Sequence, residues 1–351
     1  KNAVAYKRVV NGESLEGLYT TKILEKEMSK AGQNVVDKKA AKAEAIKETL
    51  ETNVGKMPIF NLIRNLRNIL INTPDQVDLV CEIINNREKI IKSRMLPFRF
   101  ASAYEEVEKI KTSSDVVFEN KTKTKILTAL ENAINLSCEN IPKLVGNTAI
   151  LIDHSGSMTG GSGSSAVSTF SNVTTSKIAN LFGCMLMQTQ DNVYMGLFGD
   201  TLIRVDDIDR TKGILKTHTE VHTKGTGVGG GSEHGLFLFF ADIVKHRVRV
   251  DNVVIFSDMV IGSNSWYGQG SVDGHSTNSG SFNKLLIEFK AINPQSTIIS
   301  VNLRQTDGST VFNKEHGVTQ ISGWSEKIFD TLNGLSKGYD EIIKEIEAIK
   351  L

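Results

Sequence analysis

The sequence has few cysteines, little net charge and no long apolar run. Its three cysteines, Cys81, Cys138 and Cys184, are odd in number and widely spaced, without a Cys-x-x-Cys pair. We therefore predict buried thiols in a reducing compartment, the cytoplasm, and no disulfide framework. Apolar runs such as Leu236–Ala241 are far shorter than the ~20 residues that a membrane span needs. No apolar signal core follows the first residues, so we expect neither a membrane anchor nor export.

The near-zero net charge hides an uneven distribution. The 41 Lys and Arg residues almost balance the 40 Asp and Glu residues, for a net charge of +1, which excludes a histone-like excess of positive charge. Residues 1–145 nevertheless carry a net charge of +5 and the remainder −4. Because opposite charges attract, a polyanion is expected to prefer the first part and a cation the second. Scattered charge without a function is the alternative interpretation.

The first 140 residues have the pattern of successive amphipathic helices. The segment 37–51 is rich in helix-forming residues. Pro58 suits a first helical turn, and an apolar stripe at steps of three and four follows it: Ile59, Leu62, Ile63, Leu66, Ile69 and Leu70. Pro74 and Pro97 open further segments, the latter with Phe98, Ala101, Tyr104 and Val107, and 125–136 continues the pattern. Short helices without intervening strands predict stacked pairs, as in HEAT-like repeats, although no exact repeat period is visible.

After Gly146 the pattern changes to alternating strands and helices. Four runs are typical of strands: 148–152, 192–198, 250–256 and 296–303. Helical spacing occurs between them, at 176–188, 233–245 and 282–292. This alternation predicts an α/β domain with a doubly wound, mostly parallel sheet covered on both faces. In such sheets ligands bind beyond the carboxyl ends of the strands, so we expect the site there.

An Asp-x-Ser-x-Ser motif, formed by Asp153, Ser155 and Ser157, directly follows the first predicted strand. Two short hydroxyl side chains two residues apart can point the same way from an extended loop and contact one ion. A carboxylate beside them can hold a bound water and balance the charge. Such oxygen donors suit a hard divalent cation, Mg²⁺ or a similar ion. The motif and its place resemble the metal-binding loop of von Willebrand factor A domains.

That resemblance implies two further ligands, an Asp closing a later strand and a hydroxyl from a second loop. Asp258 follows the run 253–256 and matches the first of these. For the hydroxyl we favour Ser232, which precedes an apolar helix as its counterpart in the family does, and Thr226 is the rival. Ser232 has an alternative role as the N-cap of that helix.

The whole chain resembles the Ro autoantigen (TROVE module) family. Met57–Leu66 is similar to that family's Met-Pro-Leu…Leu-Arg-Asn-Leu signature, Lys92–Phe98 to its next helices and Ile321–Ser325 to its closing segment. The resemblance implies a helical-repeat RNA-binding part (1–145) and a von Willebrand factor A domain (146–351). It also implies a non-catalytic protein that binds small noncoding or misfolded RNA in quality control. The family's helical part is longer and this chain lacks an initiator Met, so we expect N-terminal repeats to be missing or the ring to be incomplete.

Basic residues of the helical part are the candidate phosphate contacts. Arginine binds phosphate with two hydrogen bonds, and each neutralised phosphate releases a counterion, which makes affinity sensitive to salt. The candidates are Arg64, Arg67, Lys89, Lys92, Arg94 and Arg99. For Arg64, inside the apolar signature, a structural tie between helices is the alternative that we favour. Phe98 and Tyr104 could stack on bases, but their helical spacing favours core packing.

Other features are weaker. We expect Gly225-x-Gly227-x-x-Gly230 not to bind a dinucleotide, because it does not follow a first strand. His218 and His222 have the spacing of a zinc pair but lie in a Thr-rich stretch that we predict to be non-helical. No His held by a carboxylate is evident beside the Ser-rich loop, so hydrolysis is not expected.

Two Gly- and Ser-rich insertions follow strand ends, at 159–175 and 261–281. Trp266 and Tyr267 in the second are candidate partner-binding residues, with a solvated loop as the alternative. They support a second functional hypothesis, a Mg²⁺-dependent protein-interaction module without RNA binding.

Overall fold

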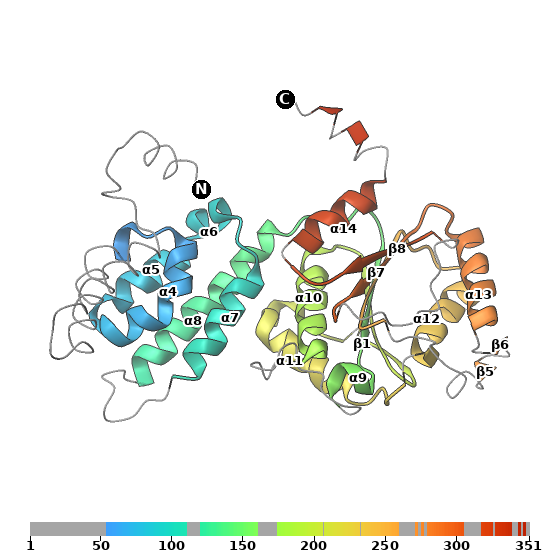
Figure 1. Cartoon of the computed structure of the whole chain (residues 1–351), viewed down its shortest axis with the longest axis horizontal. Coiled ribbons are helices and arrows are strands. Elements are labelled where there is room, and N and C mark those ends of the chain that lie inside the picture. The colour runs from blue at the N-terminus through green and yellow to red at the C-terminus, as the bar shows by residue number, and fades with distance from the viewer. Residues whose placement is uncertain are drawn as a thin grey trace, which may run out of the picture. The chain divides into compact units, whose positions relative to one another are not determined.

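The computed structural model divides the chain into two compact units, residues 1–140 and 141–351. It describes residues 54–110, 120–160, 174–205, 207–231, 233–259, 271–272, 275–276, 279–304, 317–325, 327–338, 343–344 and 347–348. Figure 1 shows helices in the first unit and a sheet between helices in the second. The predicted helix at 37–51 lies outside the described residues.

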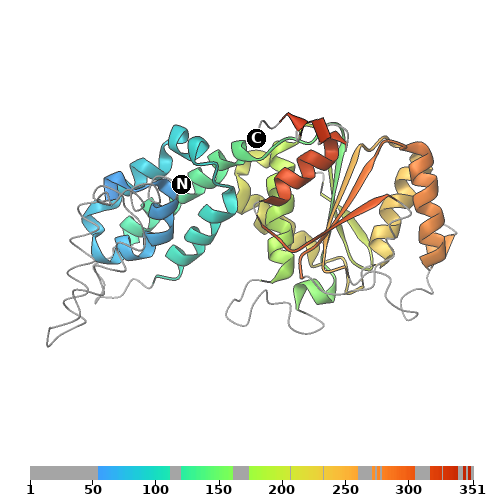
Figure 2. The ribbon, with the colours of Figure 1, turned by 45° about the horizontal axis from the view of Figure 1, so that its top comes forward.

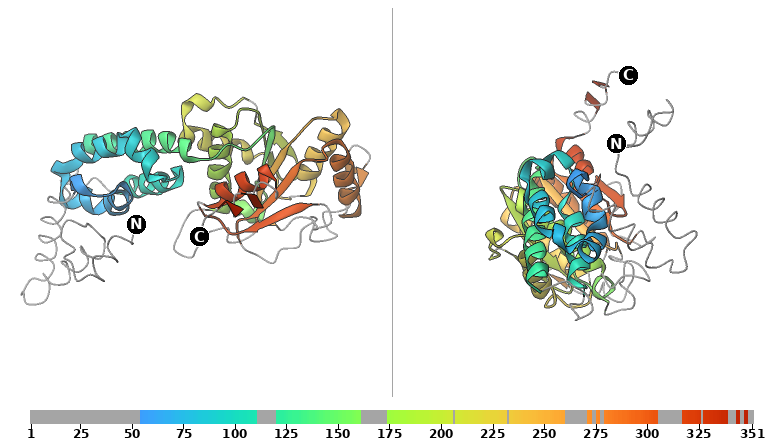
Figure 3. Two further views of the ribbon diagram at one scale, coloured as in Figure 1. Left: turned by 90° about the horizontal axis from the view of Figure 1, so that it is seen from above. Right: turned by 90° about the vertical axis from the view of Figure 1, so that its left-hand side faces the viewer.

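Five α-helices follow one another in the described part of the first unit. They are α4 (Ile59–Asn72), α5 (Val77–Asn85), α6 (Arg87–Ser93), α7 (Pro97–Glu108) and α8 (Asn120–Ser137). Three 3₁₀ turns accompany them: Val54–Lys56, Pro74–Gln76 and Cys138–Asn140. α7 lies beside α8 (Figures 1 and 3), α4 packs against α7, and α5 packs against α8. The predicted helical part is thereby confirmed.

The apolar stripe predicted after Pro58 is the buried face of α4, since all six of its residues are buried. In α7, however, the buried face is in a different phase from the predicted one. Phe100, Ala103 and Val107 are buried together with Ala101, whereas Phe98 and Tyr104 are only half-buried. Positions 100, 103 and 107 share a helical face, and the large Phe100 ring fixes that face toward the core.

A six-stranded sheet in the order β3-β2-β1-β4-β7-β8 forms the centre of the second unit. The strands are β1 (Thr148–Asp153), β2 (Val193–Phe198), β3 (Leu202–Arg204), β4 (Asn252–Ser257), β7 (Thr297–Asn302) and β8 (Val318–Ser322). All neighbours are parallel except β2 and β3. A separate antiparallel pair joins β5 (Ser271–Val272) to β6 (His275–Ser276). The four predicted strands are confirmed, and β3 and β8 are additional.

Helices cover both faces of the sheet, as Figures 1 and 2 show. On one face lie α10 (Thr175–Thr189), α11 (Ile214–Gly225) and α14 (Lys327–Lys337). On the other lie α12 (Glu233–His246) and α13 (Ser279–Ile292), whose aromatic residues Phe237, Phe240 and Phe289 fill the core against β4. This arrangement confirms the doubly wound α/β fold. The stretch containing His218 and His222 is the helix α11, so the prediction that it is non-helical is wrong.

The order of the strands places a switch point between β1 and β4. The chain passes from β1 to β2 on one side and reaches β4 on the other side of β1. All residues of β1 and β4 are buried, and the interior of each strand, 149–152 in β1 and 253–256 in β4, is a continuous apolar run. Polar residues begin where the strands end, at Asp153 and Asp258. Crevices at such switch points are where open α/β sheets bind ligands.

The three cysteines are free and buried, as predicted. Burial raises the pKa of Cys138 to about 12 and also raises that of Cys184, so both thiols are unreactive near neutral pH. Among the residues that the structure describes, no helix has the length and apolar character to cross a membrane.

Candidate functional site

Three residues of the predicted metal set meet at the carboxyl end of β1. Oδ1 of Asp153 accepts a hydrogen bond from the Ser155 amide (2.8 Å), and Oδ2 accepts one from the Ser257 hydroxyl (2.6 Å). The hydroxyl oxygens of Ser155 and Ser157 lie 3.2 Å apart. Ser155 precedes the short helix α9 (Gly156–Thr159), which turns both hydroxyls to one side. The loop thus gathers the oxygen-bearing side chains of Asp153, Ser155 and Ser157. We call these three residues, together with Asp258, the metal edge.

Asp258 follows β4 and is buried with its side chain 1% exposed. The pKa of Asp153 is raised to about 7, chiefly because the carboxyl is fully buried, and the negative charge of Asp258 raises it further. Hydrogen bonds from Ser257 and Ser155 oppose this shift. Two buried carboxylates that interact in this way are costly to ionise together without a cation between or beside them.

The donors at the metal edge fit a hard divalent ion. They are carboxylate and hydroxyl oxygens, and Mg²⁺ typically uses one or two carboxylates, further oxygens and retained waters. Within the described residues, no group of three or more His, Cys, Asp and Glu side chains could hold a metal. A metal site at this edge would use hydroxyl as well as carboxylate oxygens, and such a donor set suits a hard ion better than zinc.

The second loop of the metal set reaches the first through backbone contacts. The Gly156 amide donates to the Gly230 carbonyl oxygen (2.9 Å). The carboxylate of Asp200 accepts from the amides of Gly230 (2.8 Å) and Gly231 (2.9 Å). Ser232 itself lies outside the described residues. Gly230 and Gly231 nevertheless bring the second loop to the Ser155 loop. Asp200, in the turn between β2 and β3, holds the second loop in this position.

Thr226, the rival to Ser232, lies at the end of α11. Its hydroxyl donates to the Thr223 carbonyl oxygen (2.8 Å), and the residue is exposed. The choice of Ser232 over Thr226 stays a prediction.

His154 anchors the metal loop on the side facing the helices. Its Nε2 lies 2.7 Å from Oδ1 of Asn180 on α10, and burial lowers its pKa to about 4. A Cβ atom on Gly225 would stand 2.0 Å from the His154 ring. Only glycine fits there, so this member of the Gly-x-Gly-x-x-Gly pattern serves helix packing. His218 uses Nε2 in a 3.0 Å contact with the Lys177 carbonyl oxygen.

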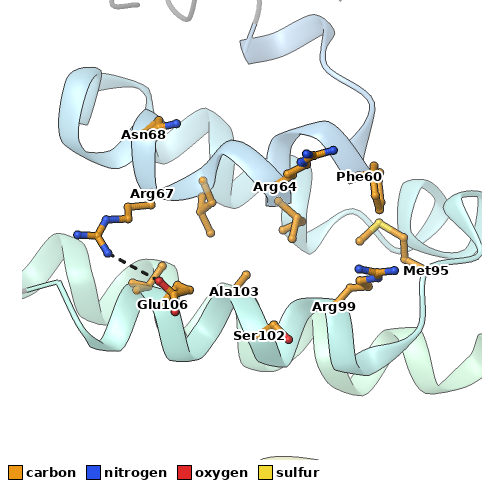
Figure 4. Close-up of a pocket in the computed structure, with 12 residues that line it drawn as sticks. Phe60, Arg64, Arg67, Asn68, Met95, Arg99, Ser102, Ala103 and Glu106 are labelled. Carbon is orange, nitrogen blue, oxygen red and sulfur yellow. Dashed lines mark ion pairs between the residues drawn. The ribbon is translucent and has the colours of Figure 1, made fainter. Parts of the chain in front are cut away.

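A groove of about 470 Å³ lies between α4 and α7 in the first unit. Figure 4 shows three arginines along it, Arg64 and Arg67 from α4 and Arg99 from α7. Arg67 faces Glu106 at 3.7 Å, and both side chains are exposed. No ion pair to Arg64 is present within the described residues, so the structural tie that we favoured for Arg64 is not observed there.

One end of this groove combines a cation with aromatic rings. The Arg99 guanidinium carbon lies 4.9 Å from the centre of the Phe98 ring and 5.8 Å from that of Phe60. Phe60 is 37% exposed, although the sequence pattern places it within an apolar signature. Met95 completes this end.

The other predicted site residues lie elsewhere. Lys89, Lys92 and Arg94 are exposed on and just after α6 and do not line the groove. Arg94 ends that helix in the left-handed conformation, with φ 54°. Trp266 and Tyr267 lie outside the described residues.

Comparison with known families identifies the helical part. Residues 22–143 match the family model of the TROVE domain. This part of the chain is similar to the TROVE domain family. The matched range contains the whole groove and the Met57–Leu66 signature, so the resemblance read from the sequence is confirmed for this part.

The fold of the chain is similar to that of a solved structure, the crystal structure of the Ro (RSR) protein of Deinococcus radiodurans. The TM-score is 0.61 at 16% sequence identity, over 95% of this chain and 66% of that chain. The likeness confirms the predicted order of a helical-repeat part and an α/β domain. This chain spans about two-thirds of the length of that protein. No curated protein matches the chain in sequence.

Proposed function

We propose that this protein is a non-catalytic RNA-binding protein of the Ro type, whose TROVE domain holds single-stranded segments of small noncoding or misfolded RNA. The observation that carries the proposal is the α4–α7 groove. It places Arg64, Arg67 and Arg99 around one cavity, together with an exposed aromatic ring, inside the matched TROVE range. Arginines bind phosphate by bidentate hydrogen bonds, and aromatic rings stack on unpaired bases.

The two helices bring these groups together by simple spacing. Phe60, Arg64 and Arg67 are four and three residues apart on α4, and Arg99, Ser102 and Glu106 are similarly spaced on α7. Each set therefore occupies one helical face, and the two faces border the groove (Figure 4). Because the Arg99 guanidinium lies against two rings, its orientation is restricted before RNA arrives. Such preorganisation reduces the entropy lost on binding.

A salt series tests this function. Binding of a single-stranded RNA to the full chain is measured between low and high salt for the wild type and for the triple variant Arg64→Gln, Arg67→Gln, Arg99→Gln. We expect the slope of log affinity against log salt to fall by about 2, because each single-strand phosphate contact contributes roughly 0.7. Lys121→Gln, which removes an exposed charge at the start of α8, is the control for a general loss of charge. No binding by the wild type at low salt, or an unchanged slope in the triple variant, contradicts the proposal.

A second candidate function rests on the metal edge. We propose that Asp153, Ser155, Ser157, Ser232 and Asp258 hold Mg²⁺ or a similar divalent ion. When bound, the ion supplies an open position for an acidic group of a protein partner. Trp266 and Tyr267 are the proposed additional partner contacts. This function is favoured by the meeting of Asp153 with two adjacent hydroxyls, and it is compatible with RNA binding in the other unit.

A further inference from the structure

One cationic side chain at the metal edge, that of Arg304, belongs to none of the sequence motifs. Nη1 of Arg304 lies 3.7 Å from Oδ2 of Asp258, and the Arg304 side chain is 33% exposed. The guanidinium thus spans from a buried carboxylate to solvent. The guanidinium therefore lies at the carboxyl end of the central strands, next to the residues that we propose to hold the metal.

The backbone fixes Arg304 in this position. β7 runs parallel to β4, with Ser257 opposite Asn302. The Leu303 amide then donates to the Ser257 carbonyl oxygen (2.9 Å), which extends the pairing by one step. The Arg304 amide donates to Oδ1 of Asn302 (3.2 Å), which turns the chain at this point. Arg304 therefore leaves its strand beside Asp258.

We propose that Arg304 is a built-in cation that holds Asp258 while no metal is bound, and that it competes with the divalent ion for this carboxylate. The inference rests on the metal site of the proposed function. A guanidinium and a divalent ion at one carboxylate repel each other at short range. Binding of the divalent ion therefore requires the Arg304 guanidinium to move away from Asp258 toward solvent. There the guanidinium can bind an anionic group of a ligand. Metal binding and ligand binding are thereby coupled.

A merely structural ion pair makes a different prediction. Removing Arg304 would then destabilise the protein and leave metal affinity unchanged or lower, because a buried charge loses its partner. If Arg304 competes with the metal, its removal has effects of opposite sign. The metal-free protein becomes less stable, whereas its affinity for Mg²⁺ rises.

Calorimetric titration of MgCl₂ into the full chain separates these alternatives. For Arg304→Gln we expect affinity for Mg²⁺ to rise about tenfold, within the range typical of coupled sites, and the melting temperature in EDTA to fall. Arg304→Lys keeps the charge and stays close to the wild type. Lys216→Gln, an exposed charge on α11, is the control. Arg304→Met, which keeps the apolar stem, replaces the glutamine variant if circular dichroism shows that the latter does not fold.

Affinity for Mg²⁺ in Arg304→Gln, or in the Arg304→Met variant that replaces it, that is equal to or weaker than that of the wild type overturns the inference. Absence of Mg²⁺ binding in all variants overturns it together with the metal site. In that case the salt series on RNA binding still decides the function of the TROVE domain by itself, so the two failures are distinguishable.

Discussion

The α4–α7 groove and the metal edge are proposed to bind charge of opposite sign, and they lie in opposite surroundings. The arginines of the groove are exposed, whereas Asp153 and Asp258 are buried. Exposed charges are screened over about 10 Å at 0.1 M salt, and buried ones much less. We therefore expect binding in the groove to weaken steeply with salt and metal binding at the edge to respond weakly. Each proposed site lies in the environment that suits its ligand, since a flexible polyanion needs an open surface and a small ion needs converging ligands.

The two sites also differ in how the chain assembles them. The groove uses residues three to seven positions apart on two helices. The metal edge joins Asp153 to Ser257 and Asp258, about a hundred residues later. Local spacing builds the first, and the topology of the sheet builds the second. Damage to one site is therefore expected to leave the other intact, because they belong to separate compact units.

The largest expected effect comes from removing the central carboxylate of the metal edge. In Asp153→Ala we expect stabilisation by Mg²⁺ to disappear, since the ion loses one of its two carboxylates. For the wild type this stabilisation amounts to about 2.7 kcal/mol when the ion is 100-fold above its Kd. Thermal melts with and without MgCl₂ measure it. Asp191→Ala, which removes an exposed carboxylate beside Lys143, is the control. Equal shifts with Mg²⁺ in Asp153→Ala and wild type would count against a metal site, and loss of RNA binding in this variant would break the independence of the two sites.

The next effect tests the packing that positions the metal loop. Gly225→Ala brings a Cβ to within 2.0 Å of the His154 ring, so the ring or α11 has to move. We expect a loss of about 1–3 kcal/mol in the free energy of unfolding, the usual cost of overpacking. Urea denaturation measures it.

The matched control is Gly227→Ala, two residues later, where the nearest atom is Cδ1 of Ile203 at 3.4 Å. That contact is close to ordinary van der Waals distance, so little change is expected. If the two variants unfold at the same urea concentration, the tight fit of His154 against Gly225 is not what holds the loop.

The metal edge and the groove show how much of each site could be predicted from the sequence. The Asp153 loop was predictable because a fully apolar strand ends directly at a polar motif. α4 was predictable because six apolar residues follow a proline at helical steps. Strand β3 was missed because it has only three residues, too few for an alternating pattern. α11 was missed because it contains several threonines, which are poor helix formers.

The structure shows why α11 is a helix despite its sequence. Thr219 and Thr223 each donate a side-chain hydrogen bond to the carbonyl oxygen four residues earlier, a local bond compatible with helix. Ile214, Thr217 and Val221 are buried, and α11 packs against α10. Tertiary packing therefore overrides weak propensity.

Long-range partners could not be predicted at all. Asp200 and Arg304 act through contacts that only the folded sheet creates, and neither belongs to a local motif. Phe60 was missed for the opposite reason, because its neighbours in the signature are core residues and the pattern does not show that this ring faces the groove.

Phe60→Ala separates stacking from electrostatics within the groove. We expect RNA affinity to fall by about 1–3 kcal/mol, the usual loss per stacked base, with an unchanged salt slope because no phosphate contact is removed. Fluorescence anisotropy at several salt concentrations measures both quantities. Ile71→Ala removes another exposed apolar side chain of α4, 44% exposed, that does not line the groove, and serves as the control. An equal loss in both variants would show that Phe60 acts only through the stability of α4.

The smallest effect is expected from Glu106, an acidic residue that lines the groove. Glu106 lies 3.7 Å from Arg67, and such exposed pairs contribute less than about 1 kcal/mol. Glu106→Gln frees Arg67 for phosphate and removes a charge that repels RNA, so we expect a gain in RNA affinity within that limit and a slightly steeper salt slope. Glu105→Gln makes the same charge change one residue earlier on α7, where the exposed side chain does not line the groove. A gain confined to Glu106→Gln assigns the effect to the groove. An equal gain in both variants would reduce it to net charge and would weaken the contrast between a shaped cationic groove and a general positive surface.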